Sequence, residues 1–492
     1  MSNVTIIPFQ PPLPQVLPTI EGNVDYRQFR ERLLRIDELL RQSGLEKQLI
    51  ETDLQHWQAA SKRVSPAAQQ NRQLHSQRAL RCNIARTLLH EDYRGFAARL
   101  ADSPVLQHFC LVSQLAVQVP SKSTLQRYDQ WWEESQVRAV ITQVLCLGAE
   151  APAQLGLAKP LDLETCFLDT TCLDAPIHYP VDWVLLRDAT RTLMKAVSLI
   201  RRQGLKQRME EPEIFLSRIN KLCIQMTHAW NKVDGQKQRK KTFRQMDRLV
   251  GTIRAHARRY REMLDTQWEK TQWTRPQAEQ VLRRMDQVLN QLPKARAQAR
   301  ERILAGRLVA NEEKILSLYE PDVQVIVRKK AGAEVEFGNT FLVGENPEGL
   351  ILDWELFKES APADSKLLPR CVDRMEKAYG PLAAIAADRG FDNETNREDL
   401  KADGIYNAVC PRSPKQLQAR AGSWKFKKLQ RRRAQTEGRI AILKNVFLGG
   451  RIRCRGFEHR KLTVTWTVLV HNLWVLARLP KPEPAAQRQR AA

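Results

Sequence analysis

Carboxylates that could do chemistry stand at three places in this sequence, Asp169, Asp388 and Glu437. Asp388 follows the short apolar run 382–387, and Asp169 lies in a similar β-prone run, 166–171. Apolar runs of this length, bounded by a turn, predict buried strands, and open α/β sheets place their sites at the carboxyl ends of strands. Taken alone, Asp388 could equally cap the following helix or pair with the arginine beside it. The matching setting of Asp169 favours a shared site.

Glu437 lies in a predicted helix, 431–446. Arg433 precedes it by one helical turn and Lys444 follows it by two, so the three side chains are expected on one face. A plain ladder of ion pairs would have the same spacing. The chain order, however, is a strand with an acid, a meander, a helix, a second strand with an acid, and then this helix. Such an order puts Asp169 and Asp388 on adjacent central strands, with the Glu437 helix packed across them.

Three carboxylates that converge on one point repel one another unless cations lie between them. Hard oxygen ligands of this kind suit Mg²⁺ or Mn²⁺. Two such ions, about 3.5–4 Å apart, can clamp the attacking and leaving oxygens of a phosphodiester displacement. The three acids therefore predict a metal-dependent reaction at a phosphodiester.

The charge balance indicates the substrate. The 492 residues include 79 Lys and Arg against 55 Asp and Glu, a net charge of +24. Such a field favours polyanions, nucleic acid first and anionic membrane second. No stretch is apolar enough to span a membrane, since the best candidate, 462–479, contains His471, Asn472 and Arg478. The nine cysteines are scattered and never spaced C-x-x-C, so we expect neither a disulfide framework nor a zinc module.

The elements that must position the acids follow from the hydrophobic patterns. We expect an α/β chain of four parts: a Pro-rich tail over 1–23, helices over 24–150, a catalytic domain over 151–480 and a basic disordered tail over 481–492. Within the catalytic domain, a basic helical insert is expected over about 183–318. The remaining elements are expected as strands 323–328, 335–343, 350–356, 382–388 and 405–410, and helices 367–379, 393–402, 431–446 and 462–479.

Two groups of basic residues could contact DNA. A predicted helix starts after Pro120, and its Lys122 and Arg127 could touch phosphates as the second helix of a helix-turn-helix does, although any capped amphipathic helix looks similar. Basic runs recur along the insert, at 237–241, 254–261 and 294–307. Each run could be a solvated helix face or a surface for a polyanion.

Four segments together resemble the DDE-type transposases of bacterial insertion sequences. They are Phe167–Asp182, Val335–Val343, Ala386–Asn393 and Arg433–Lys444; in addition, Ala101–Tyr128 is similar to the helical DNA-binding domain of that family. The resemblance implies a ribonuclease H-like catalytic domain with a mixed sheet, preceded by an all-α DNA-binding domain. It is thinnest over the helical insert.

The resemblance also implies roles for single residues. Asp169, Asp388 and Glu437 match the metal-binding triad, and Arg433 and Lys444 match basic residues on the glutamate helix. Gln430 stands where the family signature has a tyrosine. The implied activity is Mg²⁺- or Mn²⁺-dependent cleavage of element ends and transfer of the freed 3′-OH to target DNA. A cytoplasmic, nucleoid-associated dimer or higher synaptic complex on double-stranded DNA is expected.

Two alternatives stay open at this stage. A ribonuclease H-like nuclease that only hydrolyses DNA would use the same three acids without joining strands. A non-catalytic DNA-binding derivative of a transposase would use the N-terminal helices and the basic insert but not the acids.

Overall fold

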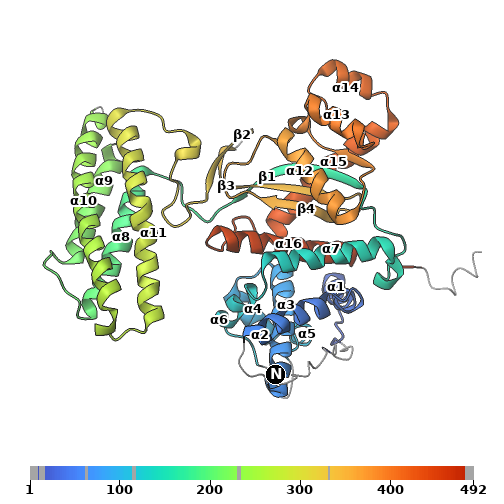
Figure 1. The fold of residues 1–492 in the computed structure, drawn as a ribbon, viewed down its shortest axis with the longest axis horizontal. Coiled ribbons are helices and arrows are strands. Elements are labelled where there is room, and N and C mark those ends of the chain that lie inside the picture. The colour runs from blue at the N-terminus through green and yellow to red at the C-terminus, as the bar shows by residue number, and fades with distance from the viewer. Residues whose placement is uncertain are drawn as a thin grey trace, which may run out of the picture.

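The computed structural model describes Phe9 and residues 17–60, 65–112, 118–229, 234–330 and 333–482. Most of the tails expected over 1–23 and 481–492 lie outside these residues. The described chain consists of helices and one mixed six-stranded sheet, which confirms the α/β class (Figure 1). No helix in the described ranges combines the length and apolar character needed to cross a membrane.

The sheet has the strand order β2-β3-β1-β5-β6, and β4 pairs with β3 as well. The pairs of β3 with β1, β2 and β4 are antiparallel, whereas β5 is parallel to both β1 and β6. β1 pairs with one edge of β3. The opposite edge of β3 pairs first with β2, over residues 333–338, and then with β4, over residues 341–345. The strands are β1 (Thr165–Asp174), β2 (Gln324–Lys330), β3 (Ala333–Glu345), β4 (Ile351–Leu356), β5 (Ala384–Ala386) and β6 (Tyr406–Asn407).

The helices after β4 surround the sheet. α15 packs on β1 and β5, and α16 packs on β4 and on the N-terminal helices. Most residues of α16 are buried, and from Leu462 on they are mainly apolar around the whole helix. These helices are α12 (Asp364–Tyr379), α13 (Glu394–Ala402), α14 (Pro414–Arg420), α15 (Trp424–Ile442), the π-helical turn η7 (Leu443–Phe447) and α16 (Phe457–Leu476).

The N-terminal helices share one continuous hydrophobic core with the sheet. Trp132 packs edge-on against Trp466 of α16, with the ring centroids 5.9 Å apart. The Nε2 atom of His459, also on α16, lies 2.8 Å from the Asp129 carboxylate. This part of the chain consists of α1 (Val24–Gln42), α2 (Leu45–Ala60), α3 (Pro66–Leu89), α4 (Tyr93–Asp102), α5 (Pro104–Phe109), α6 (Lys122–Asp129) and α7 (Glu134–Glu150).

Four long helices between β1 and β2 form a bundle that stands to one side of the sheet (Figure 1). The bundle has a hydrophobic core of its own, separate from the main core. It lies where the basic helical insert is expected. Its helices are α8 (Asp182–Arg202), α9 (Pro212–His228), α10 (Gly235–Gln267) and α11 (Arg275–Arg300).

Several element boundaries differ from the sequence prediction. The strand expected over 382–388 shortens to the three residues of β5, because only these pair with β1 and β6. The helix expected from 431 already begins at Trp424, where Ser423 caps it by accepting from the Phe426 N–H. The basic residues in its first half are therefore helical. The sequence prediction missed this part of the helix because it relied on the spacing of apolar residues, which are few there.

Candidate active site

The parallel pairing of β1 with β5 brings two of the expected acids together. Phe167 lies opposite Ala386 in this ladder, so Asp169, two residues further, comes level with Asp388. One oxygen of Asp169 accepts from the Thr170 N–H at 2.7 Å. One oxygen of Asp388 accepts from the Gly390 N–H at 2.9 Å. Asp388 thus caps the short turn after β5 with one oxygen, and it also stands beside Asp169 as the sequence predicts.

The helix that carries Glu437 is fixed to the sheet through the carboxylate of Glu345, buried at the end of β3. Glu345 accepts hydrogen bonds from Arg432 at 2.7 Å and from the Thr436 hydroxyl at 2.8 Å, and Arg439 lies 3.5 Å away. These three residues follow one another at helical spacing on α15. Gly349, with a φ of +89°, leaves room for the Arg439 guanidinium in the β3–β4 turn.

A second anchor holds the same helix over the strand ends. The side-chain amide of Gln430 donates to the carbonyl oxygens of Ala387 at 3.1 Å and Ala408 at 2.5 Å. Ala387 directly precedes Asp388, and Ala408 follows β6. Gln430 is the residue that departs from the tyrosine of the family signature, and its contacts here are to the backbone of the sheet.

Arg433 lies between Asp169 and Glu437. Its guanidinium is 3.9 Å from the Asp169 carboxylate and 4.0 Å from that of Glu437. Asp169 and Arg433 are mostly buried, whereas Glu437 is 69% exposed. The buried Nε and Nη1 of Arg433 have no hydrogen-bond partner among the described residues. These two donors are closed to solvent and unsatisfied within the described part of the protein.

Asp388 and Glu437 each lie close enough to Asp169 to act on its charge. Burial raises the pKa of Asp169 to about 6, and the charges of Asp388 and Glu437 add to this rise. The Thr170 N–H and the Arg433 guanidinium oppose it. The Asp169 carboxylate is therefore destabilised as an anion by its burial and by its acidic neighbours.

A fourth carboxylate, which the sequence analysis missed, belongs to the same region. Asp364, the first residue of α12, accepts from the Thr170 hydroxyl at 3.2 Å. A Cβ placed on Gly390 would lie 2.6 Å from Asp364 and 3.1 Å from Asp388, so both carboxylates flank the backbone of this glycine. An acid in the first turn is a helix-start signal, and it could have pointed to this residue.

The donor chemistry of these acids fits a hard divalent cation, because all the candidate ligands are carboxylate oxygens. The charge repulsion at Asp169 and the unpartnered donors of Arg433 agree with a site that is completed by further ions or ligands. Their spacing is wider than in a closed metal site, since no three His, Cys, Asp or Glu side chains of the described ranges are close enough to hold an ion.

The other expected contact residues lie apart from the acids. Lys444 is in the π-helical turn η7, beyond the regular helix, and forms no ion pair with any described residue. Lys122 and Arg127 are exposed on α6, which Ser121 caps by accepting from the Thr124 N–H. Their contact with DNA stays a prediction.

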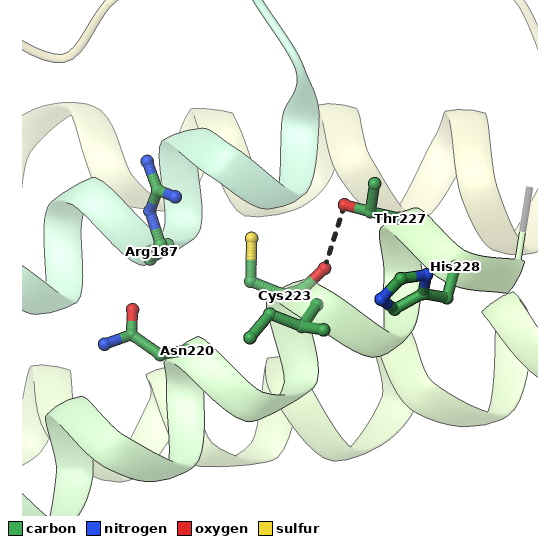
Figure 2. A pocket seen from close by; sticks show the side chains of 6 residues that line it. Arg187, Asn220, Cys223, Thr227 and His228 are labelled. Atoms are coloured by element: carbon green, nitrogen blue, oxygen red, sulfur yellow. Dashed lines mark hydrogen bonds between the residues drawn. The ribbon is translucent and has the colours of Figure 1, made fainter.

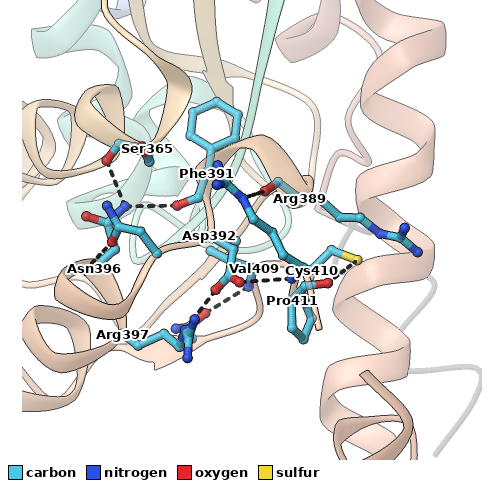
Figure 3. A network of polar contacts seen from close by, with 12 residues as sticks. Ser365, Arg389, Phe391, Asp392, Asn396, Arg397, Val409, Cys410 and Pro411 are labelled. Atoms are coloured by element: carbon cyan, nitrogen blue, oxygen red, sulfur yellow. Dashed lines mark hydrogen bonds and ion pairs between the residues drawn. The ribbon is translucent and has the colours of Figure 1, made fainter. Parts of the chain in front are cut away.

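The turn after Asp388 is held by a polar network around Asp392 (Figure 3). The Asp392 carboxylate is buried and accepts from Arg397 at 3.0 Å and from the Arg412 N–H at 2.9 Å. Asn393, the next residue, caps α13. Asp392 thus has a structural role at the start of this helix.

A surface pocket elsewhere on the molecule contains none of the expected site residues. It lies on the helical bundle between α8 and α9 (Figure 2). Its lining residues are Arg187, Asn220, Cys223, Ile224, Thr227 and His228.

The comparisons with known proteins support one family. Residues 345–473 match the family model described as transposase DDE domain. No curated protein and no solved structure matches the chain. The matched segment runs from the buried Glu345 into α16 and includes Asp388 and Glu437, whereas Asp169 and the helical bundle precede it. The carboxyl-terminal part of the chain is thus similar to the transposase DDE domain.

Proposed function

We propose that this chain is a DDE-type transposase of a bacterial insertion sequence, which cuts the ends of its element and joins them to target DNA. The parallel register of β1 and β5, which brings Asp169 level with Asp388, is the observation that carries the proposal. The fixation of α15 by Glu345 and Gln430 supports it, because it holds Glu437 over the same strand ends.

The strand order supports a ribonuclease H-like fold for this part of the chain. β4, β3 and β1 are antiparallel neighbours, and β5 and β6 continue the sheet parallel to β1. Asp169 lies on β1, Asp388 follows the neighbouring strand β5, and α15, which carries Glu437, packs on both strands. The exposed Lys122 and Arg127 on the capped helix α6 support an N-terminal contact to DNA.

In this proposal Asp169, Asp388 and Glu437 hold Mg²⁺ or Mn²⁺, which supplies Lewis-acid activation of water and of the 3′-OH. Arg433, which lies between Asp169 and Glu437, would bind a phosphate oxygen, because a guanidinium fork matches phosphate geometry. Gln430 keeps α15 in register with the strand ends, so that Arg433 and Glu437 approach the same phosphodiester.

The test is a cleavage and strand-transfer assay with the full chain and labelled DNA from the flanks of its own gene. Nicks at the element ends and joined products are expected with Mg²⁺ or Mn²⁺ but not with EDTA. Asp388→Asn should abolish both products. Asp403→Asn, which removes an exposed acid at the end of α13, is the matched control and should leave both unchanged.

Different outcomes separate the alternatives. Cleavage without any joined product would favour a hydrolytic nuclease. DNA binding without cleavage in either metal would favour a non-catalytic derivative. Unchanged cleavage by Asp388→Asn would refute the assignment of the site.

A further inference from the structure

A stripe of cations runs along the outer face of α10 in the helical bundle. We define this α10 stripe as Lys237, Lys240, Lys241, Arg244 and Arg248. At 3.6 residues per turn, these five positions fall within an arc of about 100° and so lie on one face of the helix. Lys240 is half-buried and the other four are exposed. The opposite face is apolar and fills the core of the bundle, so the helix presents the stripe outward.

The charge of the α10 stripe is not neutralised by ion pairs with the part of the chain that the structure describes. None of its five cations forms an ion pair with a described residue, although such pairs are frequent elsewhere in the bundle. The acid nearest in sequence, Asp247, is turned to α11, where Arg296 and Arg300 bind it at 2.8 and 2.6 Å. An uncompensated row of cations produces a strong positive potential at the surface.

The basic face continues to a second pair of cations, Arg258 and Arg259, which are exposed at the same angular position. From Lys237 to Arg259 the rise of an α-helix gives a length of ~33 Å. One turn of B-DNA measures about 34 Å. The face is thus long enough to follow phosphates over one helical turn of a duplex.

The surroundings of the α10 stripe argue against a membrane surface as the partner. An interfacial helix needs exposed apolar side chains beside its cations. The exposed large hydrophobic residues of the bundle are Leu199 on α8 and Ile214 and Ile224 on α9, and α10 has none.

We propose that the α10 stripe binds the phosphate backbone of double-stranded DNA, which makes the helical bundle a second DNA-contacting surface beside the active site. This inference rests on the proposed action on DNA and assigns a role to the bundle. The contact is independent of sequence, because lysines and arginines on phosphates position a duplex without reading its bases.

The bundle contains a matched control surface. α8 and α10 pack directly against each other through the bundle core, so their exposed faces point in opposite directions. The exposed cations of α8 are Arg191, Lys195 and Arg202. Replacing these three by alanine removes the same charge as replacing Lys241, Arg244 and Arg248, and both triple changes keep a good helix former at each position.

The experiment measures the affinity of the full chain for a labelled duplex over a series of salt concentrations, without divalent metal. Loss of three phosphate contacts should reduce the slope of log K against log salt by ~2.7. Over a fourfold increase in salt, the affinity of the α10 triple variant should therefore fall ~40-fold less than that of the wild type. The α8 triple variant should keep the wild-type slope, since its face does not meet the duplex.

Equal slopes for the two triple variants would overturn the proposal, because net charge alone would then explain the effect. An unchanged slope of the α10 variant would overturn it as well. A third refuting outcome concerns membranes. The proposal would fail if the wild type bound phosphatidylserine vesicles and the α10 variant lost this binding but kept the wild-type affinity for DNA. Metal-dependent cleavage by the wild type is scored separately: if it is absent while the α10 slope changes, the proposed function fails and the DNA surface stands.

Discussion

Replacing Asp169 by asparagine should make the metal-free protein more stable at neutral pH. In the folded chain the pKa of Asp169 is raised from 3.8 to about 6 by burial and by the neighbouring acids. Between these two values the folded state keeps a proton that the unfolded state has lost, so stability falls as the pH rises through this window. About two pKa units correspond to ~3 kcal/mol. The asparagine variant does not carry this cost, and its side-chain oxygen can still accept from the Thr170 N–H.

The assay is urea unfolding of wild type and variant in EDTA at several pH values from 4 to 8, which lie on both sides of the expected titration of Asp169. The difference in unfolding free energy should be near zero at the acid end and grow to ~3 kcal/mol above pH 7. The comparison at each pH removes the contributions of titratable groups far from residue 169, so the pH-dependent difference reports on Asp169 and the charges coupled to it. A difference that does not vary with pH, or a variant that is less stable at pH 8, would refute the account of the site electrostatics. The same variant should be inactive in DNA cleavage.

Three further predictions concern the anchoring of α15. Glu345→Gln should destabilise the fold by about 3–5 kcal/mol, because Arg432 and Arg439 lose a buried counter-charge; an unchanged melting temperature would contradict this. Gln430→Leu should lower the rate of DNA cleavage about 10–100-fold at unchanged DNA affinity, since the helix loses its bonds to the strand ends; equal loss of rate and affinity would show a different role. Gly349→Val should cost about 1–3 kcal/mol in urea unfolding from its positive φ, besides the collision with Arg439; a wild-type midpoint would refute it.

The pairing of Asp169 with Asp388 could be predicted because it depends on local signals. Each acid belongs to a short apolar run, and the order of elements between the runs makes the strands neighbours. The length of β5 could not be read in the same way. Its apolar run covers six residues, but only Ala384–Ala386 pair with the neighbouring strands, although β1 itself continues to Asp174.

The anchors of the site could not be predicted, because they join residues that are far apart in the sequence. Glu345 lies just beyond the strand expected over 335–343, and nothing near it indicates that Arg432 will bind it. Asp364 likewise precedes the helix expected from Leu367, and its relation to Asp388 exists only through the packing of Gly390. For the same reason the sequence divides the chain at residue 150, whereas Trp132 packs on Trp466 within one core.

The arrangement around Arg433 links the stability of this chain to its proposed activity. Arg433 is too far from Asp169 and Glu437 for hydrogen bonds, and two of its buried donors are unpartnered. Such donors cost about 1–3 kcal/mol each, and the raised pKa of Asp169 shows a further cost at the same place. A freely moving helix would relieve both by shifting, but Glu345 and Gln430 prevent this from two sides. The anchors therefore hold an unfavourable arrangement of charges that a bound cation and phosphate would satisfy, as expected for a preorganised site.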